Sequence, residues 1–181
     1  IALLEPIYDA QFASIRAARV KAMDETPIKA GRAGPGKLKA AYFWPIYGEL
    51  DEVCFPFFES RRAEHIEQAL GLTHAEGTVL LSDGYSAYTQ YANQTGLIHA
   101  QCWAHARRMF VTAEEEESAR VAEALALIGA LYAVEEAIRT RGIDAEAKLA
   151  ARRERALPAV DAFFAWVDAQ CHRLDLLPSS R

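Results

Sequence analysis

The sequence contains no long hydrophobic run, few cysteines and no excess of positive charge. No apolar stretch approaches the roughly 20 residues that a helix needs to cross a bilayer, and no secretory signal is visible at the start, so we expect no membrane partner. The three cysteines are an odd number without close pairing, which argues against a disulfide framework and favours a reducing, cytoplasmic setting. A formal net charge of -5 argues against a general electrostatic grip on nucleic acid.

What the chain does contain is an ordinary globular composition. Its 181 residues are 51% hydrophobic and 25% charged, which fits one domain with its own core, or such a domain with an appendage. Three pairs of adjacent arginines provide local positive charge, namely Arg61-Arg62, Arg107-Arg108 and Arg152-Arg153. The chain begins with Ile1 rather than Met and stops after LLPSSR, so we expect it to be part of a longer protein.

The hydrophobic pattern predicts three strands in the first part of the chain. The segment VKAMDETPIKA alternates with a period of two and places Val20, Ala22 and Asp24 on one face, so we expect Asp24 on a face that otherwise looks buried. Three glycines and a proline at 31–37 indicate a turn. The aromatic and apolar segments that follow predict a hairpin with its tip near 48–51.

Helices and two further strands follow. A helix is predicted to end at Gly71, a buried fourth strand covers 79–81, and a short helix then leads to a fifth strand before Cys102. From Trp103 onward the pattern is helical. This order predicts an α/β fold with a mixed sheet in the ribonuclease-H-like arrangement. The expected parts are a lead-in at 1–18, a core at 19–117 and a helical region at 118–181.

Two aspartates are the candidate metal ligands. Asp24 lies in the first predicted strand and Asp83 at the carboxyl end of the fourth, and these strands are neighbours in the predicted order. Their carboxyl oxygens are therefore expected within about 6 Å of each other or of a shared ion. Oxygen ligands at that separation suit Mg²⁺ or Mn²⁺, which can activate a water or a 3′-hydroxyl against a phosphodiester. The alternative is structural, since an aspartate after a strand also caps a turn.

Cys102 and His105 form a Cys-x-x-His unit at the start of a predicted helix. Zinc is the first candidate ligand for this pair, but a structural zinc usually takes four ligands. The other cysteines, Cys54 and Cys171, lie in unrelated segments, so we predict no four-ligand zinc site. The residues alone favour a core cysteine beside a histidine at the start of a helix.

Two arginines follow in the same predicted helix. Arg107 and Arg108 can contact a phosphate, because the helix N-terminus nearby also favours an anion. The alternative is a pair of surface arginines that balances the negative charge of the acidic run at 114–117.

Five segments of the chain form an ordered set: MDETPIK, LSDGYSAY, CWAHARRMF, LIGALYAVEEAIRTR and LLPSS. Together they closely resemble the catalytic region of the insertion-sequence 66 transposase family of bacterial mobile elements. That family is one of the DDE-type transposases, which have a ribonuclease-H-like core interrupted by a helical insertion. The resemblance extends from about residue 24 to residue 180. It implies a fragment of an enzyme that cleaves and joins DNA strands with Mg²⁺ or Mn²⁺.

The resemblance also implies roles for individual residues. Asp24 and Asp83 would be catalytic carboxylates that bind metal, and His105 would lie near the active site with Cys102 in support. Helices from about 119 to 173 would form the insertion. The expected partners are DNA at the transposon ends and, in the intact transposase, further copies of the protein.

One expected feature has no match in the sequence. The family's third acid is a glutamate in an Asn-Asn-x-x-Glu context downstream of LPSS, and no such motif occurs in this sequence. The N-terminal DNA-binding and leader regions that the family carries also have no match here. Glu135 and Glu136 can stand in for the third acid, but their context resembles the insertion. We therefore expect the fragment to be inactive alone.

The alternative function is that of a non-catalytic remnant, which serves as a protein- or DNA-interaction module. A ribonuclease of the same fold ranks last, because the CWAHARR segment has no role in such an enzyme.

Overall fold

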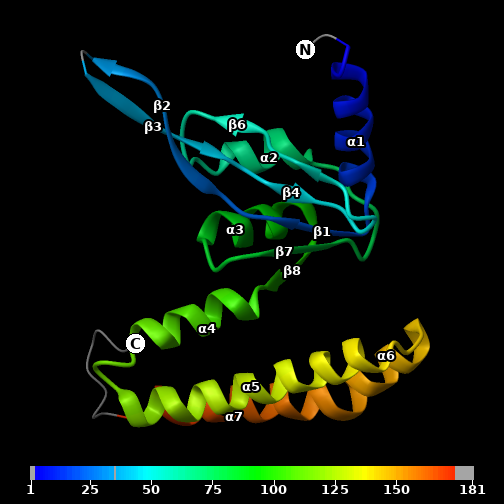
Figure 1. Cartoon of the computed structure of the whole chain (residues 1–181), viewed down its shortest axis with the longest axis vertical. Helices are drawn as coiled ribbons and strands as arrows, with labels where there is room; N and C mark the ends of the chain where they lie inside the picture. Colours follow the sequence, from blue (N-terminus) through cyan, green and yellow to red (C-terminus); the bar gives the residue numbers. More distant parts are fainter. Residues whose placement is uncertain (1–2, 35, 174–181) are drawn as a thin grey trace. The chain divides into compact units, whose positions relative to one another are not determined.

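The chain divides into an α/β unit, Ile1–Cys102, and a helical unit, Trp103–Arg181 (Figure 1). The computed structural model describes residues 3–34 and 36–173. The LLPSS segment at 176–180 lies outside the described residues. The expected division into a core at 19–117 and an insertion at 118–181 concerns functional organisation and stays a prediction. None of the described helices is both long enough and apolar enough to span a bilayer.

A mixed five-stranded sheet forms the centre of the first unit, in the order β5-β4-β1-β7-β8. Its strands are β1 (Val20–Met23), β4 (Ile46–Tyr47), β5 (Val53–Cys54), β7 (Val79–Ser82) and β8 (Ile98–Gln101). The pairs β5–β4 and β4–β1 are antiparallel, whereas β1–β7 and β7–β8 are parallel. The predicted pairing of the first and fourth strands, β1 and β7, is therefore confirmed, as is the mixed α/β class.

A second sheet lies next to the first along the chain. It contains β2 (Thr26–Gly34), β3 (Lys37–Phe43) and β6 (Phe57–Phe58). Gaps of two residues separate β1 from β2, β3 from β4 and β5 from β6, so each predicted long strand is divided between the two sheets. Pro45 and Pro56 stand in two of the gaps, where a proline has no N–H for the ladder. Their carbonyls accept instead, from Asp24 N at 3.2 Å and from Trp44 N at 2.9 Å. Residues 24–25 therefore lie outside the regular strand pairing.

Three helices pack on the core of the first unit. They are α1 (Glu5–Ala17), α2 (Glu64–Leu70) and α3 (Ser86–Thr95). Their apolar side chains meet the buried sheet residues Met23, Ile46 and Leu80 in one cluster, which includes fully buried Trp44. The predicted helix stop at Gly71 is confirmed, since this residue has a φ of 80°, where only glycine is unstrained.

The faces of β1 are the reverse of the prediction. Lys21 and Met23 are buried, whereas Val20 is half exposed. Met23 joins the core, and Lys21 becomes tolerable there because its Nζ donates to the carbonyl of Arg16 at 2.6 Å. Burial lowers the pKa of Lys21, although the charge of Glu49 opposes this shift. Asp24 thus continues the more exposed face.

The described part of the second unit consists of helices joined by short turns, which confirms the helical pattern predicted from Trp103 onward. Its elements are α4 (Trp103–Thr112), α5 (Ser118–Arg141), α6 (Ala145–Ala151), a π-helical turn η1 (Arg152–Ala156) and α7 (Leu157–Cys171). Asp144 caps α6 by accepting from Ala147 N at 2.8 Å. Ile128 and other buried residues form one stripe of α5, and Phe163 of α7 stacks edge-on against Trp103 with ring centroids 4.9 Å apart.

Candidate active site

The two predicted aspartates lie at one edge of the five-stranded sheet. Asp24 directly follows β1, and Asp83 directly follows β7. In the parallel ladder Val20 pairs with Val79 and Ala22 with Leu81, and two residues further along each strand come Asp24 and Asp83. Register partners on adjacent strands lie about 4.8 Å apart. The strand register therefore brings both carboxylates to corresponding positions, while the separation of their oxygens stays a prediction.

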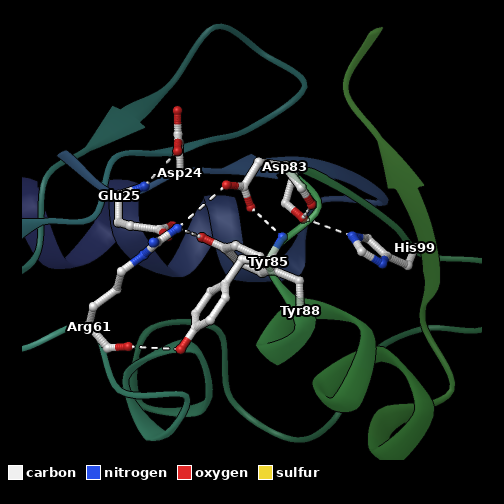
Figure 2. Close-up of polar contacts among 8 residues, drawn as sticks. Asp24, Glu25, Arg61, Asp83, Tyr85, Tyr88 and His99 are labelled. Atoms are coloured by element: carbon white, nitrogen blue, oxygen red, sulfur yellow. Dashed lines mark hydrogen bonds and ion pairs between the residues drawn. The ribbon is translucent and has the colours of Figure 1, made fainter. Parts of the chain in front are cut away.

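Glu25, which the sequence analysis did not single out, is a buried acid next to Asp24. Its side chain is 2% exposed and forms an ion pair and a hydrogen bond with the guanidinium of Arg61 (Figure 2). The other carboxylate oxygen accepts from the hydroxyl of Tyr88 at 2.7 Å. A buried carboxylate needs such partners, because its desolvation would otherwise favour the neutral form.

Arg61 links this buried acid to a predicted site residue. Its Nη2 lies 3.5 Å from Asp83 Oδ2, and its guanidinium carbon lies 4.4 Å from the centre of the Tyr85 ring. Burial lowers the pKa of Arg61, whereas the hydrogen bond to Glu25 and the charges of Glu25 and Asp83 raise it. The second group of effects is larger, so the pKa of Arg61 is raised. A permanent cation therefore stands between Glu25 and Asp83 (Figure 2).

Two tyrosines at the start of α3 hold the site together. The hydroxyl of Tyr85 donates to the carbonyl of Arg61 at 3.0 Å, so Tyr85 supports Arg61 through both its ring and its oxygen. Tyr88 is fully buried, and its burial raises its pKa, with further increases from Glu25, Asp83 and Asp24. Three carboxylates thus act on one hydroxyl, which stays protonated and donates to Glu25.

Both aspartates also have the local role that the structural alternative predicts. Asp83 Oδ1 accepts from Tyr85 N at 2.9 Å, as an aspartate does in a turn before a helix. Asp24 Oδ1 accepts from Glu25 N at 2.8 Å. The two oxygens of Asp83 have different partners: Oδ1 accepts from the backbone of Tyr85, and Oδ2 lies near Arg61. The local bonds fix the orientation of each carboxylate.

A histidine on β8 borders the site. His99 Nε2 lies 2.8 Å from the hydroxyl of Ser82, and its Nδ1 lies 3.3 Å from that of Thr89. Burial lowers the pKa of His99, while the charge of Asp83 acts in the opposite direction. Sequence reasoning missed this histidine, because its partners come from β7 and α3 and no spacing within β8 indicates them.

The other predicted residues lie at the junction of the units and in the second unit. Cys102, half-buried, ends the first unit and donates its N–H to the carbonyl of Ser82 at 2.9 Å. His105 is half-buried in α4, whereas Arg107 and Arg108 are exposed and line an open hollow with Tyr132 of α5. The predicted approach of His105 to the aspartates stays a prediction.

The donor chemistry of the site suits a hard divalent ion. Asp24 and Asp83 offer oxygen ligands from a single sheet edge, as Mg²⁺ or Mn²⁺ requires. Glu25 is already engaged by Arg61 and Tyr88. Among residues 3–34 and 36–173, no group of three or more His, Cys, Asp or Glu side chains is arranged to hold a metal. An ion held by Asp24 and Asp83 would therefore need further ligands from outside the described residues.

Comparison with known proteins identifies one family and two similar proteins. The family model described as "Transposase IS66 family" matches residues 1–181. Two similar proteins come from Sinorhizobium fredii (strain NBRC 101917 / NGR234). "Uncharacterized protein y4jD" is 32% identical over an alignment of 172 residues that covers 87% of this chain and 33% of that protein. "Uncharacterized protein y4qI" is 29% identical over an alignment of 157 residues that covers 78% of this chain and 28% of that protein. The chain thus spans about a third of their length.

Proposed function

The chain belongs to the transposase IS66 family, and we propose that it is part of the catalytic region of a DDE-type transposase that cleaves and joins DNA strands. The observation that carries this proposal is the register of β1 and β7, which leads to an aspartate just beyond each strand. The proposed core is ribonuclease-H-like. Support comes from a sheet with three antiparallel strands followed by two strands parallel to the first.

In this proposal Asp24 and Asp83 hold Mg²⁺ or Mn²⁺. When bound, such ions activate a water or a 3′-hydroxyl and stabilise the leaving oxygen of a phosphodiester. The backbone N–H groups of Glu25 and Tyr85 orient the two aspartates. Arg61 balances the negative charge of Glu25 and Asp83 before DNA or metal arrives.

The third carboxylate is proposed to come from another part of the longer protein. Glu25 serves as a structural acid, because its two oxygens are occupied by Arg61 and Tyr88. Glu135 receives a two-point contact from Arg152 at 2.7 and 2.8 Å, and Glu136 pairs with Arg139. These bonds favour a surface role for both helical glutamates. The chain alone is accordingly proposed to be inactive.

DNA is the proposed substrate, with the transposon ends as its specific sites and a homo-oligomer as the working form of the intact protein. Arg107 and Arg108 contact phosphates, which their exposure on α4 supports. His105 acts near the metal-binding aspartates, with Cys102 supporting the start of the helix.

A second candidate function is a non-catalytic interaction module. The observation that favours it is the engagement of the acids within the protein, where Asp83 both caps a turn and pairs with Arg61. In this case Asp24 and Asp83 stabilise the fold and bind no metal.

Metal binding separates the two candidates. Titration of the full chain with Mn²⁺, followed by the paramagnetic resonance signal of the free ion, should show binding that Asp24→Asn and Asp83→Asn each weaken by about tenfold or more. Asp161→Asn is the matched control, because Asp161 is an exposed acid of the helical unit. Equal Mn²⁺ affinity in all four proteins would favour the interaction module over the transposase site.

A further inference from the structure

A two-stranded ribbon of the first unit has an unusual charge. We call residues 26–34 of β2 and 37–43 of β3 the basic ribbon. Between positions 26 and 48 the sequence contains four basic residues and no acidic one, although acidic residues outnumber basic ones in the whole chain by 25 to 20. The four are Lys29, Arg32, Lys37 and Lys39. Positive charge is thus concentrated on one element of an acidic protein.

The register distributes these residues over both faces of the basic ribbon. Lys29 lies opposite Ala40, and after a bulge Arg32 lies opposite Leu38, so both basic positions fall on one face. Lys37 and Lys39 are two residues apart in β3 and share the other face. The bulge therefore matters, because the odd spacing between positions 29 and 32 would otherwise place them on opposite faces.

The basic ribbon is accessible from both sides at Lys29, Leu38 and Lys39. Figure 1 shows β2 and β3 extending away from the helices of their unit. Lys29 is exposed, and Lys39 is 53% exposed even though it forms an ion pair of 3.0 Å with Glu59. An exposed pair of this kind contributes little and is easily exchanged for another anion. Leu38, next to the turn, is 60% exposed.

The dimensions and chemistry of this element fit duplex DNA. A two-stranded antiparallel ribbon fits the major groove of B-DNA, and lysine or arginine on both faces can reach the phosphates that line the groove. β2 begins directly after Asp24 and Glu25, so DNA on the basic ribbon would continue toward the acidic site.

We propose that the basic ribbon is a binding surface for duplex DNA, distinct from the arginines of α4. The choice of DNA as partner rests on the proposed function, and the absence of acidic residues from positions 26 to 48 provides the charge complementarity. The contacts are mainly to phosphates, so the binding is expected to depend steeply on salt and weakly on base sequence.

The test compares two triple variants of the full chain with the same loss of charge. The ribbon variant carries Lys29→Gln, Arg32→Gln and Lys37→Gln, and the control variant carries Arg141→Gln, Arg153→Gln and Arg155→Gln, which are exposed positions of the helical unit. Binding of a fluorescent 20-base-pair duplex, a length of about two helical turns, is measured by anisotropy over a range of salt concentrations. Circular dichroism checks that both variants are folded.

The ribbon variant is expected to lose about tenfold or more in affinity at low salt, and the slope of log K against log salt should fall by about one per lost contact. The control variant should stay near the parent. Equal losses in both variants, or no duplex binding by the parent chain, would overturn the proposal. A change in sedimentation of the ribbon variant without a change in DNA binding would instead assign the ribbon to contacts between copies. Because the assay contains no metal, its result is independent of the Mn²⁺ test of the proposed function.

Discussion

The two units use the same charged residue types in different surroundings. In the first unit the Glu25 carboxylate is 2% exposed and shares Arg61 with Asp83. In the second unit the Arg152–Glu135 pair joins η1 to α5 with both side chains about half exposed, at 51% and 47%. A buried acid depends on its partner, whereas an exposed acid can exchange its partner for water. The comparison indicates that the fold holds the first cluster in a fixed arrangement, whereas the second lies on the surface of the helical unit.

Removing the arginine from each pair should give the largest difference. Arg61→Ala is expected to destabilise the first unit by about 2–3 kcal/mol, because Glu25 stays buried without its cation; the cost is below that of a fully buried pair because Arg61 is partly exposed. Arg152→Ala is the control and should cost less than about 1 kcal/mol. Urea unfolding followed by circular dichroism measures both. Similar costs for the two variants would remove the distinction between the clusters.

The hydroxyl of Tyr88 tests the same cluster from the opposite side. Tyr88→Phe keeps the ring in the core but removes the hydrogen bond to Glu25, so we expect a loss of about 1–2 kcal/mol in the free energy of unfolding. Tyr132→Phe, at a partly exposed tyrosine of α5, should change stability by less than about 0.5 kcal/mol.

The parent and Tyr88→Phe should also differ in how their stability depends on alkaline pH. The pKa of Tyr88 is raised in the folded protein, so the folded state holds this proton more tightly than the unfolded state. Its contribution is complete below the ordinary tyrosine pKa of 10 and decreases as the pH rises above that value. The parent should therefore lose stability above pH 10 more steeply than Tyr88→Phe. Parallel pH profiles would contradict the burial of an ionisable hydroxyl beside three acids.

The smallest expected effect concerns His99. Its pKa is lowered by burial, so the neutral form is favoured in the folded protein, and its contribution to stability is present above the ordinary value of 6.5. As the pH falls below 6.5, that contribution should decrease by less than about 1 kcal/mol in the parent, and His99→Gln should flatten this part of the profile. His172→Gln, at the exposed end of α7, is the matched control. Thermal unfolding between pH 5 and pH 8 measures the difference.

Several features of the site were predictable from local pattern. Asp83 follows a short apolar strand, and Asp24 follows an alternating segment whose parallel pairing with that strand depends on the order of elements. The chain supplied a weaker signal for Arg61, as one of the adjacent pair Arg61-Arg62. No local signal indicated Glu25, because alternation with a period of two specifies that neighbouring residues face opposite sides but not which side is buried.

The sequence by itself determined the order of the main strands and helices, the pairing of β1 with β7 and the position of Asp83 at the end of its strand. These features follow from periodicity, glycine stops and connection rules, all of which act over short stretches of chain. Asp24 was predicted within the first strand, whereas the structure places it just after β1. Only the tertiary structure decided which face of β1 is buried, since that choice depended on Met23 entering the core and on the Arg16 carbonyl accepting from Lys21. The tertiary structure also brought Arg61 to Glu25, across 36 residues, because a buried carboxylate requires a partner and the sequence does not specify which cation the fold delivers.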